Sequence, residues 1–593
     1  MRRRTRFAAG AAALAGLGLI FSGVGPASAA SYVRISGEGS SWAGLAWSDF
    51  SSNAQRQGVT VDYTANGSSQ GRDDFARQTN ATFADSEIPF KGDASDPQDT
   101  TAVPFAYGML PVVAGGTAFM YNLPIGGAQY SGLKLTMANI AKIFSGQVTN
   151  WDDPSIQANN PGVTLPNHTI DVVARSDGSG ATAQFKLWML RQFPADYAYL
   201  AGHTGGDPSH ASSYFPVGSL SNFTAQNGST GSSQFVANTA YSINYDEYAY
   251  ASEFHLPVAS IRNQAGFYVQ PTPKAVAVAL IAAKINTNQN DPNYLSQDLS
   301  NVYTYADPRA YPMSMYSYEI VPHAVNAVTS AAKGATLAWV STQALCEWQR
   351  DMGPLGYSPL PMNLVLAGFN QLLGIPGIDA ATKASIASTV KGVLQSGTNP
   401  CNNPTFQPGD DPSHNVLVDT APFPAGCNAA CEAPWRQAGK GVNNNGPQYG
   451  TTTVKPAQNT PQNTTTQQQN QPGTNTTGTG TGKTGRTGTS TPTGSSTSPA
   501  TTTQATNAPG GTSTGGGGGG QSCDADTGVC TGGDSTTGTT TVANVQAVPM
   551  TIAASDGWTG TQWIGLVFGL LVFAALIVAP ALVSAATRGG GGK

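Results

Sequence analysis

Three short turns rich in glycine and serine are the parts of this chain best suited to holding an anion. They span residues 37–42, 67–71 and 175–180, and each precedes a helical pattern. Glycine lets the backbone approach a ligand closely, and the first amides of a helix have no partner inside the helix. The helix dipole adds positive potential at the same end. A single such turn is more often an ordinary helix cap, so the prediction depends on all three together.

Charged side chains in and near these turns make the prediction more specific. Arg175 can donate two parallel hydrogen bonds to an oxyanion, which a lysine does less well. The alternative for Arg175 is a salt bridge, with Asp177 as a nearby partner. A buried Asp85 or Glu87 facing the ligand would favour an anion that still carries a proton, as phosphate does and sulfate does not near neutral pH. The alternative is that both acids are solvated on a loop.

The elements around these turns follow an alternation of strands and helices. Residues 59–63 alternate in polarity as a strand does, and residues 170–173 resemble a buried strand. Thr136 is predicted to cap a helix that ends at Gly146. Strands that alternate with helices predict an α/β architecture with mainly parallel pairing.

The two ends of the chain are predicted to export and anchor it. Residues 1–30 have the basic start, apolar run and small-residue cleavage site of a secretory signal. Residues 563–586 lack charge and have the length of a transmembrane helix, a buried core helix being the alternative. Positive charge in residues 587–593 predicts a cytoplasmic tail, which places the bulk of the chain outside the cell.

A long polar stretch separates the predicted membrane helix from a folded head at residues 31–436. Between Tyr449 and Met550 the chain has no aromatic residue, no Leu and no Ile. Such a segment cannot bury enough apolar surface to offset the entropy of ordering, so residues 437–557 are predicted to be a disordered linker. As a flexible coil, about 100 residues span roughly 50–60 Å.

Six cysteines lie in the C-terminal half, and an even number in an exported chain indicates disulfide bonds. Cys523 and Cys530 are predicted to pair with each other. The other four allow three connectivities, which the sequence leaves open: Cys346, Cys401, Cys427 and Cys431. A metal site at the last two is a weak alternative because no histidine or second pair lies at zinc spacing. No metal or cofactor is therefore expected.

The net charge of −5 and the charged fraction of 11% give no basic stripe, so no nucleic-acid partner is expected.

The head resembles the phosphate-binding component of the high-affinity phosphate ABC transporter, the PstS-like family. The most telling segment is residues 143–154, Ile-Phe-Ser-Gly-Gln-Val-Thr-Asn-Trp-Asp-Asp-Pro, within a match that runs from Ile35 to about Pro361. Other matching segments are residues 35–39, 67–69, 83–89, 133–136, 175–180 and 246–250. The resemblance implies a two-lobed, hinged periplasmic-binding-protein type II fold. Lobe 1 would comprise about residues 31–111 and 312–436, and lobe 2 about 112–311.

The resemblance also implies a ligand set for phosphate. It would consist of Ser41, the amide of Trp42, Ser68, Arg175, Ser179 and the amide of Gly180. The family's buried aspartate, which accepts the ligand's proton, falls at Glu87, and Asp85 could replace it after a local shift. Ala181 stands where the family has a threonine, although Thr182 follows, and losing one such hydroxyl costs roughly 1.5–3 kcal/mol. Asp177 is a supporting candidate.

These features predict a non-enzymatic receptor with a monomeric head, which captures inorganic phosphate outside the cell and delivers it to the membrane permease of an ABC transporter. Two alternatives remain. One is a surface adhesin or sensor on the same fold, with which the long stalk is compatible. The other is an exported serine hydrolase, in which residues 67–71 fit GxSxG, Ser69 is the nucleophile and His255 or His323 supplies the base.

Overall fold

The computed structural model describes residues 32–92, 94, 96–438 and 444–449, and the backbone of residues 522–523 and 530–531. The predicted signal at residues 1–30, the predicted membrane helix at 563–586 and the tail at 587–593 lie outside the described residues. Among the helices that are described, none has both the length and the apolar composition needed to span a bilayer.

A six-stranded sheet carries two of the three turns. Its strand order is β12-β4-β17-β3-β1-β2. Strand β1 pairs in parallel with β2 and β3, whereas β17 runs antiparallel to β3 and β4, and β12 antiparallel to β4. The bounds are β1 Ile35–Gly39, β2 Val61–Thr64, β3 Phe83–Ser86, β4 Tyr107–Ala118, β12 Asp246–Glu247 and β17 Ser314–Pro322.

A second sheet carries the third turn. Its order is β10-β9-β11-β5, with β9 parallel to β10 and β11, and β5 antiparallel to β11. The bounds are β5 Tyr121–Asn122, β9 Asp171–Arg175, β10 Phe223–Gln226 and β11 Ser242–Asn244. A third sheet has the order β14-β13-β8, with β8 Lys134–Thr136, β13 Ser260–Arg262 and β14 Tyr268–Val269. Isolated pairs join β6 Pro124–Ile125 to β7 Ala128–Gln129, and β15 Lys284–Ile285 to β16 Gln297–Asp298.

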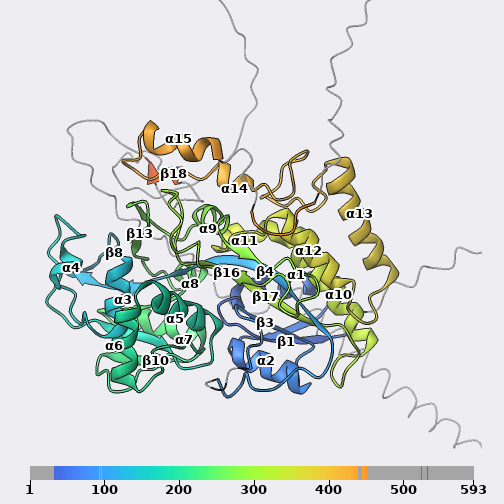
Figure 1. Cartoon of the computed structure of the whole chain (residues 1–593), viewed down its shortest axis with the longest axis horizontal. Helices are drawn as coiled ribbons and strands as arrows, with labels where there is room; N and C mark the ends of the chain where they lie inside the picture. The colour runs from blue at the N-terminus through green and yellow to red at the C-terminus, as the bar shows by residue number, and fades with distance from the viewer. Residues whose placement is uncertain are drawn as a thin grey trace, which may run out of the picture. The chain divides into compact units, whose positions relative to one another are not determined.

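Helices cover these sheets in two groups, which Figure 1 shows on opposite sides of the head, with the long strand β4 running between them. The blue and yellow group contains α1 Gly44–Arg56, α2 Ser68–Arg77, α10 Ala331–Leu345, α11 Met352–Leu355, α12 Met362–Leu372, α13 Ala380–Ser396 and the 3-10 helix Glu347–Asp351. The cyan and green group contains α3 Met137–Ser145, α4 Pro154–Gln157, α5 Gly180–Gln192, α6 Pro194–Thr204 and α7 Gly228–Asn238. The remaining helices are α8 Tyr248–Glu253, α9 Pro273–Leu280, α14 Val416–Asp419 and α15 Ala429–Ala438.

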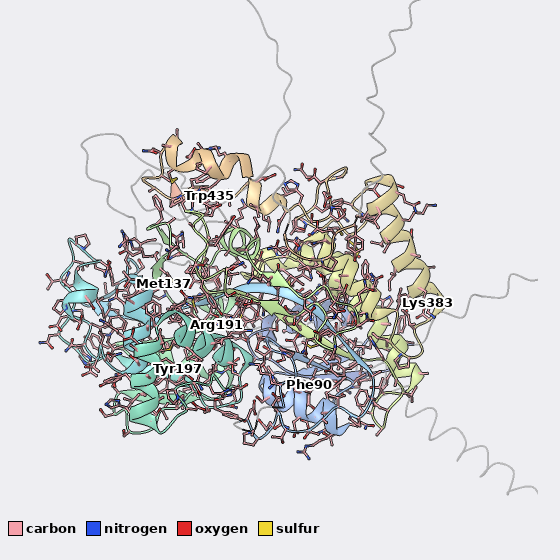
Figure 2. All side chains as sticks on the ribbon, viewed as in Figure 1. Phe90, Met137, Arg191, Tyr197, Lys383 and Trp435 are labelled. Atoms are coloured by element: carbon pink, nitrogen blue, oxygen red, sulfur yellow. A yellow bond between two sulfur atoms is a disulfide. The ribbon has the colours of Figure 1, made fainter. Side chains whose placement is uncertain are left out.

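Side chains fill the space between these layers. Figure 2 labels Met137 and Tyr197 in the cyan and green group, and exposed Lys383 on α13 at the opposite edge of the view. Beneath the first turn, the buried ring of Trp47 lies 5.3 Å from that of Tyr63 and 4.5 Å from that of Phe83. This aromatic cluster fixes α1 on the six-stranded sheet.

The predicted helix after Thr136 is confirmed. Thr136 caps α3 by accepting a hydrogen bond from the amide of Asn139, whose side chain accepts one from the amide of Thr136 in return. The helix ends at Gly146, whose φ of 82° is a left-handed conformation that glycine adopts without steric cost.

The prediction of mainly parallel pairing is wrong for the longest strands. Strand β17 pairs antiparallel with β4 along its whole length, from Ser314 opposite Gly116 to Pro322 opposite Tyr107. The chain reaches β17 after passing through the second and third sheets, so this pairing does not come from the strand–helix–strand units on which the prediction was based.

Two disulfides select one of the three connectivities that the sequence left open. Cys346 is bonded to Cys401, and Cys427 to Cys431, so the metal alternative at the second pair is wrong. The expected pairing of Cys523 with Cys530 involves side chains outside the described set, although the two backbones lie opposite each other in the antiparallel pair β18 Ser522–Cys523 and β19 Cys530–Thr531.

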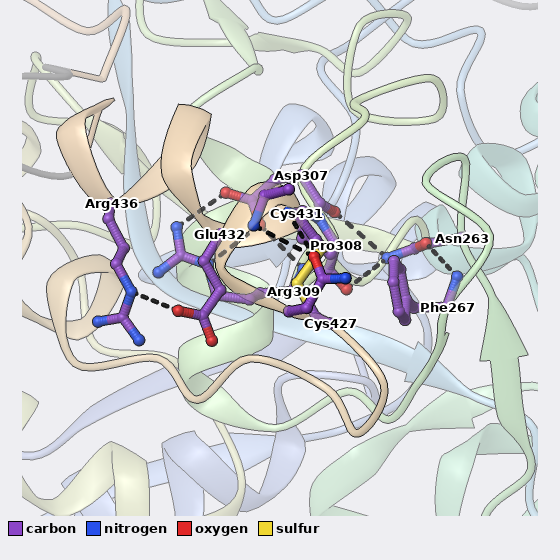
Figure 3. Close-up of a disulfide and its surroundings, with 11 residues drawn as sticks. Asn263, Phe267, Asp307, Pro308, Arg309, Cys427, Cys431, Glu432 and Arg436 are labelled. Carbon is purple, nitrogen blue, oxygen red and sulfur yellow. Dashed lines mark hydrogen bonds and ion pairs between the residues drawn. A yellow bond between two sulfur atoms is a disulfide. The ribbon is translucent and has the colours of Figure 1, made fainter.

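The Cys427–Cys431 bond lies at the start of α15 (Figure 3). Glu432 accepts a hydrogen bond from Arg436 on the same helix. Two guanidinium groups contact the ring of Phe423: the central carbon of Arg436 lies 5.1 Å from the ring centroid, and that of Arg309 lies 4.5 Å from it. Arg309 also pairs with Asp307, 2.8 Å away. These contacts attach the C-terminal part of the head to the segment that precedes β17.

The head extends beyond the predicted boundary at residue 436. Helix α15 continues to Ala438, and residues 444–449 pack on the head. The side-chain amides of Asn444 and Asn363 exchange hydrogen bonds of 2.6 and 2.7 Å. The polar composition of this stretch concealed the contact, which combines amide pairing with packing of the half-buried Tyr449 against the core.

Candidate functional site

The three turns meet at the carboxyl ends of parallel strands. As predicted, each leads into a helix, and each also follows a strand: β1 precedes α1, β2 precedes α2 and β9 precedes α5. The amide of Gly67 donates to the carbonyl of Gly39 at 2.8 Å, and the amide of Ser69 donates to the carbonyl of Gly178 at 2.9 Å. The second bond joins the six-stranded sheet to the four-stranded one, so side chains from both sheets converge here.

Ser68 connects the start of α5 to a buried acid. Its hydroxyl accepts a hydrogen bond from the amide of Gly180 at 3.0 Å and donates one to Glu87 Oε2 at 2.8 Å. A Cβ at Gly180 would lie 2.4 Å from Glu87 Oε2 and 2.9 Å from the Glu87 amide nitrogen. The carboxylate therefore sits directly against the first residue of the helix, where only glycine leaves enough room.

Glu87, rather than Asp85, is the acid at this point. Ser40 and Ser317 also donate hydrogen bonds to Glu87 Oε1, the latter at 2.8 Å. Asp85 instead accepts from the indole of Trp47 at 2.7 Å and contacts the Ser317 hydroxyl at 2.5 Å. Both acids are at most 1% exposed, so the alternative of solvated acids is wrong.

Arg175 forms a salt bridge with Asp177, the alternative to its role as a ligand, and it also contacts Ser41, another residue of the expected ligand set. Its Nε and Nη2 donate to the two oxygens of Asp177 at 2.8 and 2.5 Å, and Nη2 donates to Ser41 Oγ at 2.6 Å. A second acid, Asp246, lies 3.6 Å from Nη1. Burial alone lowers the pKa of Arg175, but the charges of Asp177 and Asp246 outweigh it and raise the pKa, so the guanidinium stays charged.

The remaining predicted residues line the same region with different roles. Ser179 caps α5 by accepting a hydrogen bond from the amide of Thr182. The hydroxyl of Thr182 lies 2.7 Å from that of Tyr245, so it does not occupy the position of the hydroxyl absent at Ala181. Trp42 is buried, with its ring 5.9 Å from that of Tyr357.

Four side chains at the site were not predicted from the sequence. They are Ser40, Ser229, Asp246 and Ser317. Ser40 lies in the first turn and Asp246 in the matching segment 246–250, although neither was singled out as a ligand. Ser229 also left a signal: residues 227–230, Asn-Gly-Ser-Thr, repeat the pattern Asn-Gly-Ser-Ser of residues 66–69. Both segments follow a strand, enter a helix and contain a glycine with positive φ, 102° at Gly67 and 67° at Gly228.

The hydrolase alternative is not supported by the surroundings of Ser69. Its hydroxyl donates to Asp96 at 2.5 Å and lies 3.5 Å from Nη2 of Arg72. The ring of His323 instead contacts the carbonyl of Gln371 at 2.9 Å. A serine nucleophile needs a base within hydrogen-bond reach, and here an acid that is itself paired with an arginine takes that position.

Residues 24–340 match the family model of a PBP superfamily domain. The chain is 33% identical over 309 residues to the phosphate-binding protein PstS3 of Mycobacterium bovis, covering 51% of this chain and 76% of that protein. It is 28% identical over 320 residues to the phosphate-binding protein PstS of Methanocaldococcus jannaschii, covering 53% and 78%.

Solved structures also align with the chain. A phosphate-binding protein from Stenotrophomonas maltophilia is 17% identical with a TM-score of 0.40, over 63% of this chain and 97% of that one. A putative phosphate ABC transporter substrate-binding protein with bound phosphate, from Clostridium perfringens, is 15% identical with a TM-score of 0.35, over 55% and 100%.

The match to the family model and the identity with the mycobacterial protein agree with the α/β architecture and with the resemblance carried by residues 143–154. The chain belongs to the PstS family of phosphate-binding proteins, within the PBP superfamily.

Proposed function

We propose that this protein captures inorganic phosphate in the cleft between its two lobes and delivers it to the membrane permease of an ABC transporter, without catalysing a reaction. The observation that carries the proposal is the position of Ser68, whose hydroxyl bonds both to Glu87 and to the first amide of α5. The carboxylate of Glu87, a proton acceptor, and the first amide of α5, an anion-binding group, are therefore both hydrogen-bonded to the side chain of Ser68.

These two groups favour phosphate over sulfate for a simple reason. Phosphate near neutral pH can donate a proton to Glu87 while its other oxygens accept hydrogen bonds from amides, hydroxyls and Arg175. Sulfate has no proton to give, so an ionised Glu87 facing it would be left unpaired against like charge in a buried site. The proposed ligand set is Ser41, the amide of Trp42, Ser68, Glu87, Arg175, Ser179 and the amide of Gly180.

The proposed lobes are about residues 31–111 with 312–436, and about 112–311. Closure of the lobes by a hinge would exclude water and strengthen each charged hydrogen bond. Backbone contacts such as Ser69 to Gly178, at 2.9 Å, are of the kind that would hold the lobes together. A micromolar or tighter site requires about −8 kcal/mol or better, which a preorganised set of charged hydrogen bonds can supply.

Export by residues 1–30 and anchoring by residues 563–586 are part of the proposal, with a monomeric head held outside the cell. An anchor would raise the concentration of the receptor near its permease.

The test is a calorimetric titration of the full chain with phosphate and then with sulfate. The expected result is micromolar or tighter phosphate binding, little sulfate binding, and a loss of at least about a hundredfold in Arg175→Ala. Arg191→Ala is the control, because Arg191 lies on α5 but is 42% exposed and pairs with Asp298. Absence of phosphate binding by the folded wild-type chain would overturn the proposal.

A further inference from the structure

A hydrogen bond between Tyr214 and Gln98 joins the two proposed lobes outside the ligand set. The hydroxyl of Tyr214 donates to Oε1 of Gln98 at 2.7 Å. Tyr214 lies between α6 and β10, in proposed lobe 2, and Gln98 lies between β3 and β4, in proposed lobe 1. Both side chains are half-buried, so water can replace each partner when the lobes separate.

Two buried acids hold the segment around Gln98 in place. Asp96 and Asp99 lie 3.4 and 3.2 Å from the guanidinium group of Arg72, and all three side chains are at most 1% exposed. Breaking a buried ion pair leaves an uncompensated charge, so this segment stays on Arg72. Arg72 is part of α2, and Gln98 is therefore fixed to the helix that begins at Ser68.

A chain of side-chain amides sets which end of Gln98 faces Tyr214. Nε2 of Gln98 donates to Oε1 of Gln70, and Nε2 of Gln70 donates to Oδ2 of Asp74 at 2.8 Å. Burial raises the pKa of Asp74, but hydrogen bonds from Thr79 and Gln70 outweigh it and lower the pKa. An ionised carboxylate only accepts hydrogen bonds, so each amide in the chain must turn its NH2 group towards Asp74. The oxygen of Gln98 is thereby left facing the Tyr214 hydroxyl.

Tyr214 is held on its own side by α5. Its backbone carbonyl accepts a hydrogen bond from Nζ of Lys186 at 2.7 Å, and the Lys186 side chain is buried on α5. This helix begins at Gly180, whose amide donates to the hydroxyl of Ser68. The bond between Tyr214 and Gln98 thus connects two helices whose first residues, Ser68 and Gly180, both belong to the proposed ligand set.

A bond of this kind acts on binding through closure of the lobes. If it exists in the closed arrangement and is lost when the lobes separate, it shifts the population towards the closed form. Release of the anion is then slower, whereas the first encounter of the anion with the open form is unchanged.

We propose that Tyr214 and Gln98 form a latch, a pair of positioning residues that holds the lobes closed over bound phosphate and sets how long the anion is retained. The inference rests on the proposed function, because it assigns residues outside the ligand set to closure of the same site. The latch acts on release, and the choice between phosphate and sulfate stays with Glu87.

The test is a stopped-flow measurement of the rates at which inorganic phosphate associates with the full chain and dissociates from it. Tyr214→Phe removes only the hydroxyl. It is expected to raise the dissociation rate about three- to tenfold, with the association rate within about twofold of wild type. An unchanged dissociation rate overturns the inference, and so does a loss that appears in the association rate alone.

Tyr268→Phe is the matched control. The hydroxyl of Tyr268 donates to Oδ1 of Asn159 at 2.5 Å, and both side chains are half-buried like those of the latch. Both residues lie in proposed lobe 2, so this variant is expected to release phosphate at the wild-type rate. Equal acceleration of release by Tyr268→Phe and Tyr214→Phe would overturn the inference.

Melting temperatures separate a latch from a bond that merely supports the fold. Tyr214→Phe is expected to lower the melting temperature of the chain saturated with phosphate and to leave that of the phosphate-free chain unchanged. An equal loss in both states would mean that the bond does not depend on closure, which overturns the inference.

A double variant shows whether the two residues act through one bond. Gln98→Ala is expected to release phosphate at least as fast as Tyr214→Phe, and the double variant as fast as Gln98→Ala alone. Additive effects overturn the inference while leaving the proposed function intact. Absence of phosphate binding by the wild-type chain overturns the proposed function, and this inference with it.

Discussion

The hydroxyl of Ser317 lies within hydrogen-bond distance of Glu87, at 2.8 Å, although 230 residues separate the two in the chain. The same hydroxyl contacts Asp85 at 2.5 Å. Because a serine has one proton, it can donate to only one of these acids at a time. The other acid must carry a proton of its own. Burial, followed by the charge of Glu87, raises the pKa of Asp85 well above its usual value, which identifies Asp85 as the protonated partner.

Asp85→Asn is therefore expected to keep the fold and to increase stability near neutral pH. An acid whose pKa is raised in the folded state stabilises the fold fully below its unfolded pKa, about 3.9, and this contribution is lost as the pH rises towards the folded pKa. The asparagine variant lacks that loss, so its melting temperature should fall less between pH 4 and 8. Asp85→Ala, which leaves the buried indole of Trp47 without an acceptor and removes one of the two contacts of the Ser317 hydroxyl, should be less stable than wild type throughout. Equal destabilisation by both substitutions would count against a protonated Asp85.

Glu87→Gln is expected to change selectivity. The amide can no longer accept the proton of phosphate as an ionised carboxylate does, so phosphate binding should weaken by about tenfold or more. The repulsion that excludes sulfate is removed at the same time, and the ratio of phosphate to sulfate affinity should fall further. Titrations with both anions check this, and an unchanged ratio would mean that Glu87 does not face the ligand.

Gly180→Ala tests the crowded start of α5. The added methyl group would lie 2.4 Å from Glu87 Oε2 and 3.0 Å from Ser68 Oγ, so the acid and the helix must separate. We expect phosphate binding to fall by at least about tenfold. Gly231→Ala, in α7, is the control because its added methyl group would meet no atom within 4 Å. If the two variants bind phosphate equally well, the contact between Gly180 and Glu87 has no role in binding.

The two disulfides are expected to contribute unequally to stability. Cys346–Cys401 closes a loop with a sequence separation of 55, and Cys427–Cys431 one of only 4. Chain-entropy reasoning gives about 4 kcal/mol for the longer loop and about 2 kcal/mol for the shorter. Denaturant unfolding of Cys346→Ser/Cys401→Ser and of Cys427→Ser/Cys431→Ser checks the order. A larger loss from the second pair would contradict it.

The residues of the site that could be predicted from the sequence are those that lie beside a glycine just after the end of a strand. Ser68, Arg175 and Gly180 could be predicted because each is in such a turn, and a local pattern carries the information. Ser317 could not, because it reaches the site through strand β17, which joins the six-stranded sheet after a long excursion of the chain.

A short sequence pattern in a glycine-rich turn is not enough to show that the turn belongs to the site. Ser229 lies in a turn of the same form as the one containing Ser68, yet the similarity extends over four residues and becomes informative only once both are seen to contact one site. Asn444 was assigned to the linker for a related reason: its partner, Asn363, is far away in sequence and the pairing is polar.

The most direct test of the central claim is equilibrium dialysis of the full chain with radiolabelled phosphate, with and without a thousandfold excess of unlabelled sulfate. The account predicts one phosphate bound per chain with micromolar or tighter affinity, at about −8 kcal/mol or better, and no displacement by sulfate. Displacement by sulfate, or no retention of phosphate by the folded chain, would contradict it.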